Sequence, residues 1–185
     1  MAKICVKQRG FSLIEVLVTL VILAIGLLGV AGMQARLQQS EMEAYQRSQA
    51  LLLLDDMANR LAANRNAAAS YVAATAAAAA GSTCPSSVAT QLERDASEWC
   101  NALQGAGEVS GSSKVGAMLG GRGCVQALGS GEYLLTVAWQ GLGPLVAPPA
   151  GVTCGANAYD GGTGAVCHDD LCRRVVTTIV RVASL

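Results

Sequence analysis

The feature that most constrains this chain is an apolar run, residues 11–33, in which Glu15 is the one charged residue. A run of this length is enough to cross a bilayer whose hydrocarbon core is about 30 Å thick. Three cations, Lys3, Lys7 and Arg9, precede it. Because such cations stay on the cytoplasmic side, the pattern predicts one membrane-spanning helix with the rest of the chain on the opposite side.

A carboxylate inside an apolar span is costly, at about 2.5–3.5 kcal/mol at the bilayer centre, and marks a functional site by default. Glu15 lies near the start of the run, so the alternative is a side chain that reaches the aqueous interface. Further along, Gly26, Gly29 and Gly32 recur every third residue. Small residues allow close helix packing in lipid, although glycine is also simply tolerated in membrane helices.

Length and charge limit the rest of the chain. At 185 residues it has room for one domain and an anchor. The net charge is zero, and without residues 1–10 it becomes −3, because 10 cations then face 13 acids. A head with this charge balance is not expected to bind nucleic acid.

Cysteine is concentrated in the C-terminal part of the chain. Of seven cysteines, Cys5 lies in the basic leader. The other six are Cys84, Cys100, Cys124, Cys154, Cys167 and Cys172. Six cysteines behind a membrane-targeting segment indicate up to three disulfides in an oxidising compartment. About fifteen pairings are open to six cysteines, and the sequence does not choose among them.

Two ordinary interpretations of the N-terminus are a secretory signal cleaved near Val30-Ala31-Gly32 and an uncleaved anchor. The apolar run is long for the core of a signal peptide, and Glu15 is out of place there. Neither interpretation gives Gly10 a specific role.

The segment Gly10-Phe11-Ser12-Leu13-Ile14-Glu15-Val16 resembles the leader junction of type IV prepilins and pseudopilins. The resemblance implies that residues 1–10 are a leader, which a prepilin peptidase removes between Gly10 and Phe11. It also implies N-methylation of the Phe11 amine and an assembly ion pair between that amine and Glu15. In the family this pair is thought to form between neighbouring subunits.

A second, less specific resemblance covers residues 49–61, which are similar to the stretch behind the anchor in minor pilins of the PilV type. It implies a structural subunit that helps to initiate pilus assembly and lies in or at the tip of the pilus. Its partners would be the membrane, the prepilin peptidase, other minor pilins, the major pilin and a tip adhesin. The alternatives are a minor pseudopilin of type II secretion or of a DNA-uptake system.

The resemblance also implies a place in the cell. The chain would be held in the inner membrane by its single span, with the head in the periplasm, and would reach the extracellular pilus after assembly. We expect the leader in residues 1–10, the span in 11–33, an amphipathic helix half in 34–66 and a disulfide-bonded head in 67–185.

No proline interrupts residues 11–66, so we expect one long helix whose second half packs on the head. Its predicted apolar side consists of Leu37, Tyr45, Leu52, Leu54, Met57, Ala58 and Leu61. Two acid-first i,i+4 ion pairs are expected on it, Glu43 with Arg47 and Asp56 with Arg60.

The head is predicted to be α+β, with a pilin-like antiparallel sheet against the long helix. Residues 67–83 are alanine-rich and show no stripe to bury, which predicts a connecting segment. A second helix is expected over 86–103, with Trp99 in the core. Strands are expected over 133–140 and 173–183, the latter in an inner position, with a weaker strand over 123–128.

Catalytic chemistry finds little support in the sequence. His168 is the one histidine, and together with Cys167 and Cys172 it has loose spacing for zinc and no evident fourth ligand. An oxidising compartment favours disulfides at these cysteines. We therefore predict no metal, no cofactor and no enzymatic activity.

Overall fold

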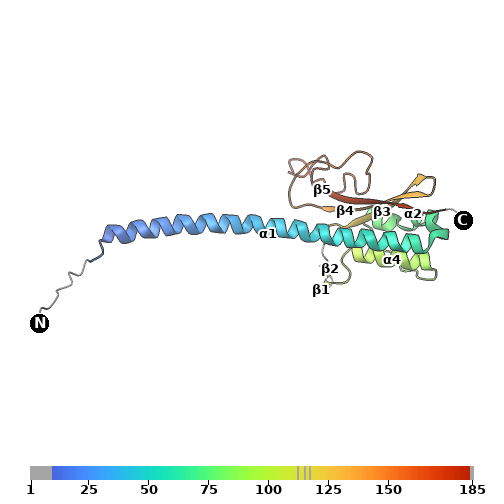
Figure 1. The fold of residues 1–185 in the computed structure, drawn as a ribbon, viewed down its shortest axis with the longest axis horizontal. Coiled ribbons are helices and arrows are strands. Elements are labelled where there is room, and N and C mark those ends of the chain that lie inside the picture. Colours follow the sequence, from blue (N-terminus) through green and yellow to red (C-terminus); the bar gives the residue numbers. More distant parts are fainter. Residues whose placement is uncertain (1–9, 112, 115, 117, 184–185) are drawn as a thin grey trace, which may run out of the picture. The chain divides into compact units, whose positions relative to one another are not determined.

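A computed structural model of the chain describes residues 10–111, 113–114, 116 and 118–183 (Figure 1). Most of the predicted leader, residues 1–9, lies outside the described residues. The chain divides into two units, residues 1–41 and residues 42–185.

The predicted long helix is confirmed as α1, Leu13–Ala63. In the first unit, every described residue of α1 is exposed. In the second unit, α1 buries one stripe with spacings of four, four, three and four residues. This stripe consists of Gln46, Ala50, Leu54, Met57 and Leu61. Such spacing keeps the side chains on one face of a helix with 3.6 residues per turn.

Three members of the predicted apolar side are exposed instead. Leu37, Tyr45 and Leu52 have exposed fractions of 55%, 48% and 60%. Leu52 lies two residues from both Ala50 and Leu54, about 200° around the helix from each, so it cannot share their face. The prediction was wrong here because it followed hydrophobic residue types, whereas the buried face also uses an alanine and a glutamine.

The alanine-rich segment forms three short helices. They are η1 (Arg65–Ser70), α2 (Tyr71–Ala74) and α3 (Ala76–Ala80), and α3 ends at Gly81 with φ of +64°. Ala68, Tyr71, Thr75 and Ala78 are buried at spacings of three, four and three residues. The prediction of a segment without a stripe was wrong, because Ala68, Thr75 and Ala78 have small side chains that a hydrophobic pattern does not separate from exposed alanines.

The second predicted helix is α4, Gln91–Leu103. It begins five residues later than predicted, because Thr90 and Glu93 form a capping box that satisfies free backbone N–H groups at this end. Trp99 is fully buried, as predicted. Its indole Nε1–H donates to the carbonyl of Leu53 in α1 at 2.8 Å, so this side chain joins the two helices.

The three predicted strands are confirmed as β3 (Arg122–Gly129), β4 (Glu132–Gln140) and β5 (Arg173–Arg181). They form an antiparallel sheet in the order β3-β4-β5. The inner position predicted for the last strand was wrong: β5 is an edge strand and β4 is the inner one. Burial explains this order, because β4 is buried at five successive residues, from Leu135 to Trp139, on both of its faces.

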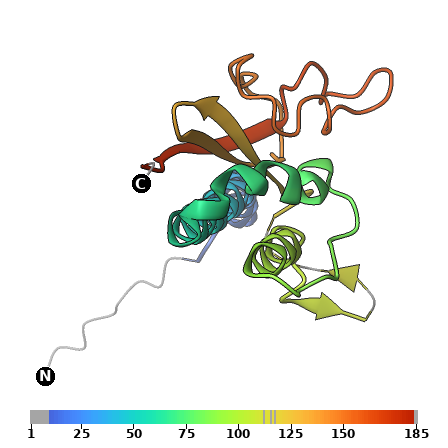
Figure 2. The ribbon, with the colours of Figure 1, turned by 90° about the vertical axis from the view of Figure 1, so that its right-hand side faces the viewer.

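The predicted α+β fold is confirmed. The main core joins residues of α1, α2, α3 and α4 to the sheet, and Figure 2 shows helices gathered on one side of the strands. A smaller core of Ala138, Cys154 and Tyr159 lies under the segment between β4 and β5. A two-stranded ribbon, β1 (Val109–Ser110) with β2 (Ser113–Lys114), completes the head.

Three disulfides join the six candidate cysteines of the head. Cys84 pairs with Cys100, Cys124 with Cys154, and Cys167 with Cys172. The first ties the segment before α4 to that helix, and the second ties β3 to the segment between β4 and β5. These are the pairings that the sequence left open.

The buried alanine stripe gives a direct test of the fold. Ala78 has an exposed fraction of 2%, whereas Ala76, on the same short helix, is exposed. We expect Ala78→Glu to lower the free energy of unfolding by about 2 kcal/mol or more, because it forces a carboxylate into the core. The matched control, Ala76→Glu, should change it by less than about 0.5 kcal/mol. Equal effects in urea unfolding of the full chain in detergent would contradict this packing.

Candidate functional site: an exposed apolar helix and an ionic network around a buried aspartate

The candidate processing site lies directly before α1. Gly10 and Phe11 precede the helix, and Phe11 has an exposed fraction of 82%. The carbonyl of Ser12 accepts hydrogen bonds from the N–H groups of Glu15 at 3.0 Å and Val16 at 3.3 Å, and these begin the helix. Glu15 is exposed in the first turn, where a carboxylate suits the positive end of the helix dipole.

The apolar part of α1 is long enough to cross a membrane. An 18-residue window in it has a mean hydropathy of 2.8, and none of that window is buried. Length and composition alone support this statement, and a signal sequence would pass the same test. Gly26, Gly29 and Gly32 have open space around them, since an added Cβ would meet nothing within 4 Å. Close packing of another helix at these glycines therefore stays a prediction.

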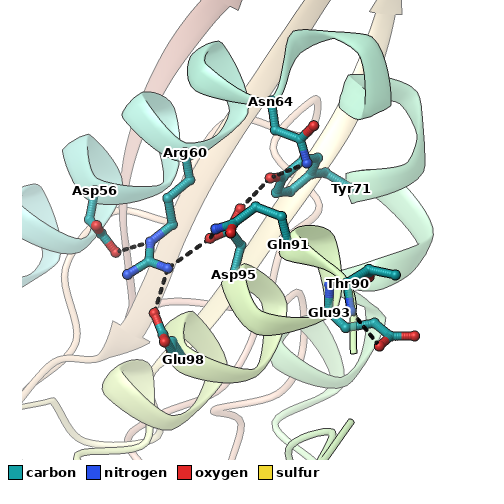
Figure 3. Close-up of polar contacts among 9 residues, drawn as sticks. All are labelled: Asp56, Arg60, Asn64, Tyr71, Thr90, Gln91, Glu93, Asp95 and Glu98. Carbon is teal, nitrogen blue, oxygen red and sulfur yellow. Dashed lines mark hydrogen bonds and ion pairs between the residues drawn. The ribbon is translucent and has the colours of Figure 1, made fainter. Parts of the chain in front are cut away.

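A charged network joins α1 to α4 in the second unit (Figure 3). Arg60 of α1 donates from Nε to Asp56 Oδ2 at 2.9 Å, and from Nη1 to Asp95 Oδ1 at 3.0 Å and Glu98 Oε2 at 2.7 Å. Burial works against the charged guanidinium, but the hydrogen bonds to Glu98, Asp56 and Asp95 outweigh it and raise the pKa of Arg60. One cation thus holds carboxylates from both helices.

Asp95 is the buried centre of this network, with an exposed fraction of 2%. Besides Arg60, it accepts hydrogen bonds from the Tyr71 hydroxyl and from Gln91 Nε2, the latter at 2.8 Å. Burial, and then the hydrogen bond to Asp95, raises the pKa of Tyr71 to about 12. A buried carboxylate needs this many partners, because leaving one unpaired costs several kcal/mol.

Sequence reasoning found only part of this network. The predicted pair of Asp56 with Arg60 is present, but Tyr71 and Asp95 were missed. Two signals were available: Tyr71 is the bulkiest residue of the alanine-rich segment, and Asp95 stands beside the apolar stripe of the second helix. The predicted pair of Glu43 with Arg47 was wrong.

Glu43 instead anchors the segment that follows β4. Its carboxylate accepts from the N–H of Leu142 at 3.3 Å and lies 3.7 Å from Nη2 of Arg174. Arg174 also donates to the carbonyl of Gly143 at 2.7 Å. These contacts link α1, β5 and the intervening segment, a long-range arrangement that local i,i+4 spacing does not reveal.

The segment between β4 and β5 is held from inside by Arg173, whose exposed fraction is 3%. Its guanidinium donates to the carbonyls of Val152 at 2.7 Å and Cys154 at 3.1 Å, and to Asp170 Oδ2 at 2.8 Å. Asp170 in turn accepts from the N–H of Asn157 at 2.7 Å. The buried cation therefore organises a segment that has no regular secondary structure.

The residues weighed for a metal site serve other contacts. Cys167 and Cys172 are joined to each other, so neither is available as a thiolate ligand. His168 Nδ1 lies 2.9 Å from Asp169 Oδ2 on the surface. Within the described part of the chain, no group of three or more His, Cys, Asp or Glu side chains is placed to hold a metal ion.

Comparison with known families gives two matches. Residues 5–31 match the model of the prokaryotic N-terminal methylation motif, and residues 32–107 match the model of the type IV pilin Tt1218. Comparisons with curated proteins and with solved structures gave no match. Type IV pilins are structural rather than enzymatic proteins, and the long helix with its small antiparallel sheet is consistent with their fold.

The ionic network gives a test by substitution. Arg60→Met keeps much of the side-chain volume but leaves Asp95 buried without its cation, so we expect a loss of about 2–4 kcal/mol in unfolding free energy. Arg47→Met, on the same helix at an exposed position, should change it by less than about 0.5 kcal/mol. A wild-type value for Arg60→Met would show that Asp95 does not depend on this cation.

The pKa of Tyr71 gives a test by pH. Because the folded-state pKa is near 12 and the ordinary value is 10.0, the folded state holds the proton more tightly. This contribution to stability is complete below pH 10 and is lost as the pH rises through 12. Urea unfolding between pH 9 and 12 should therefore show a steeper loss for the wild type than for Tyr71→Phe. Parallel curves would contradict the buried hydrogen bond to Asp95.

Proposed function

We propose that this chain, which carries a prepilin methylation motif and a type IV pilin domain, is a minor type IV pilin of the PilV type. It is a structural subunit that helps to initiate pilus assembly and is incorporated in or at the tip of the pilus. The observation that carries the proposal is the position of Glu15, in the first turn of an exposed apolar helix directly behind Gly10 and Phe11.

Cleavage and the carboxylate then act together. Cutting between Gly10 and Phe11 leaves the apolar helix attached and creates an ammonium four residues before Glu15. Methylation of this amine keeps its positive charge. A carboxylate in lipid is tolerated when it has such a partner, and the amine of a neighbouring subunit would fix the register of the two helices.

The expected partners and location follow from this role. The span holds the subunit in the inner membrane with its head in the periplasm until it enters a pilus. There it contacts other minor pilins, the major pilin and a tip adhesin through α1 and the head. Gly26, Gly29 and Gly32 supply a face on which another apolar helix can approach closely.

Glu15 gives the test of the assembly role. We expect Glu15→Ala and Glu15→Gln to insert in the membrane normally but to reduce the amount of the subunit in sheared pili at least several-fold, because both lack the carboxylate. Thr19→Ala, one turn further along α1, is the matched control and should leave the amount unchanged. Wild-type amounts with either Glu15 variant would reject the ion pair.

A deletion strain separates a pilus subunit from a pseudopilin. Loss of twitching motility with normal release of exoproteins supports the proposal. Normal motility with blocked release would instead assign the chain to type II secretion, and loss of DNA uptake alone would assign it to an uptake system.

A further inference from the structure

A pocket of about 590 Å³ lies beside the end of α3 and the start of β3. Of the described residues that line it, only Arg122 is charged, and four of the others are glycines. Its wall is therefore largely bare backbone, which a ligand can approach closely. Met118 and Leu119 add apolar side chains, of which Leu119 is 50% exposed. An apolar wall with one placed polar group is the usual composition of a small-ligand site.

Neighbouring groups hold the guanidinium of Arg122 in place. Its Nη1 donates to the carbonyls of Ala79 at 3.3 Å and Ala80 at 2.7 Å. Gly81 lies against the same group, since an added Cβ there would come within 3.2 Å of Cζ. The ring of Tyr159 also faces it, with the ring centroid 5.8 Å from Cζ. A guanidinium that is already ordered in this way loses little freedom when it binds a ligand.

The charge of Arg122 has no carboxylate partner in the described part of the chain. Among the described arginines, four are buried or half-buried. Three of them form ion pairs: Arg60 with Asp56, Asp95 and Glu98, Arg173 with Asp170, and Arg174 with Glu43. Arg122 is the exception, although a cation that is withdrawn from water usually has a paired anion. This difference indicates that its anion comes from outside the described residues.

One edge of the guanidinium is available to that anion. Nη1 bonds to the two carbonyls, whereas Nε and Nη2 of Arg122 donate to no carbonyl or carboxylate among the described residues. The Nε atoms of Arg173 and Arg174 are buried without a partner, but Nε and Nη2 of Arg122 are not buried in this way. A ligand can therefore reach them. The N–H groups of this edge are parallel and match the two oxygens of a carboxylate.

We propose that this pocket is a binding site for a carboxylate that carries a short apolar body. The carboxylate pairs with the Nε–Nη2 edge of Arg122, and the apolar body lies against Met118 and Leu119. One carboxylate balances the one cation of the pocket, whereas a phosphate dianion would leave a negative charge uncompensated. This inference goes beyond the proposed function and does not depend on it.

Capping of α3 accounts for only part of this arrangement. A cation near the last carbonyls of a helix is favourable in itself, and Nη1 of Arg122 supplies the donors for Ala79 and Ala80. The Nε–Nη2 edge takes no part in the cap. A cap alone therefore predicts no carboxylate binding in the pocket, and a titration separates the two interpretations.

The test titrates the full chain in detergent with sodium butyrate and follows isotope-labelled arginine and glycine by NMR, with sodium chloride as the salt control. We expect a saturable shift of the Arg122 Nε–H signal, with a dissociation constant of about 10 mM or tighter. Arg65, an exposed arginine outside the pocket, should show no saturable shift. Butyramide has the same shape without the charge, so it should bind at least about tenfold more weakly.

A variant of the apolar wall keeps the test independent of the cap. Leu119→Glu places a second carboxylate in the pocket, where it competes for Arg122 or repels the ligand, so butyrate should bind at least about tenfold more weakly. The unfolding midpoint should stay at the wild-type value, because the Leu119 side chain is already 50% exposed. Leu128→Glu, on β3 at 51% exposure, is the matched control and should bind butyrate normally.

Two probes distinguish a free acid from a carboxylate on a protein. The first is butyrate, and the second is an acetylated and amidated tripeptide of leucine, glutamate and leucine, whose one carboxylate is a side chain. Either probe supports the proposal if it binds in a way that Leu119→Glu weakens, and the tighter one identifies the source. No saturable shift with either probe, equal binding of butyrate and butyramide, or normal binding by Leu119→Glu would overturn it. Because binding is measured in solution, the result is independent of whether the subunit enters a pilus.

Discussion

The structure depends on one constraint: a single helix, α1, has to satisfy two different surroundings. Up to residue 41 its described side chains are exposed and mostly apolar, which suits lipid or other apolar helices rather than water. From Gln46 to Leu61 it buries one stripe of its side chains in the core of the head. The first part of α1 is mostly apolar on all sides, and the second part buries only one side, so one unbroken helix can suit both surroundings. The sequence contains no proline between these parts.

Besides the apolar core, three residues in the second part of that helix hold the head through polar contacts. Glu43 holds the segment after β4, the carbonyl of Leu53 accepts the Trp99 indole, and Arg60 holds Asp95 and Glu98 of α4. The ionic contact adds little net stability relative to an apolar core of similar shape, because desolvation offsets much of the attraction. A shift of either helix would separate the buried Asp95 carboxylate from the Arg60 guanidinium, so the contact favours one register of α4 against α1.

Sequence patterns predicted the elements whose periodicity is strong. The long helix, the three strands of the sheet and the burial of Trp99 follow from hydrophobic spacing. The patterns failed where a contact is long-range or a buried side chain is small. The buried stripe of the alanine-rich segment looks like its exposed neighbours, and Arg60 reaches Asp95 across 35 residues of sequence. At Glu43 a local pair with Arg47 was expected, but tertiary contacts to Arg174 and Leu142 prevailed. The edge position of β5 also lay beyond prediction, because its composition suits an inner strand equally well.

The central claim is that processing at Gly10 leaves α1 attached and creates the cation that Glu15 requires. The intact mass of the mature protein, measured without reduction on the membrane fraction, tests this claim most directly. The account predicts the mass of residues 11–185 with one added methyl group and six hydrogens fewer, for the three disulfides. A mass that corresponds to a chain starting at Met1 would contradict it, because Glu15 would then lack the nearby amine. A mass that corresponds to a start near Met33 would also contradict it, because Glu15 itself would be removed.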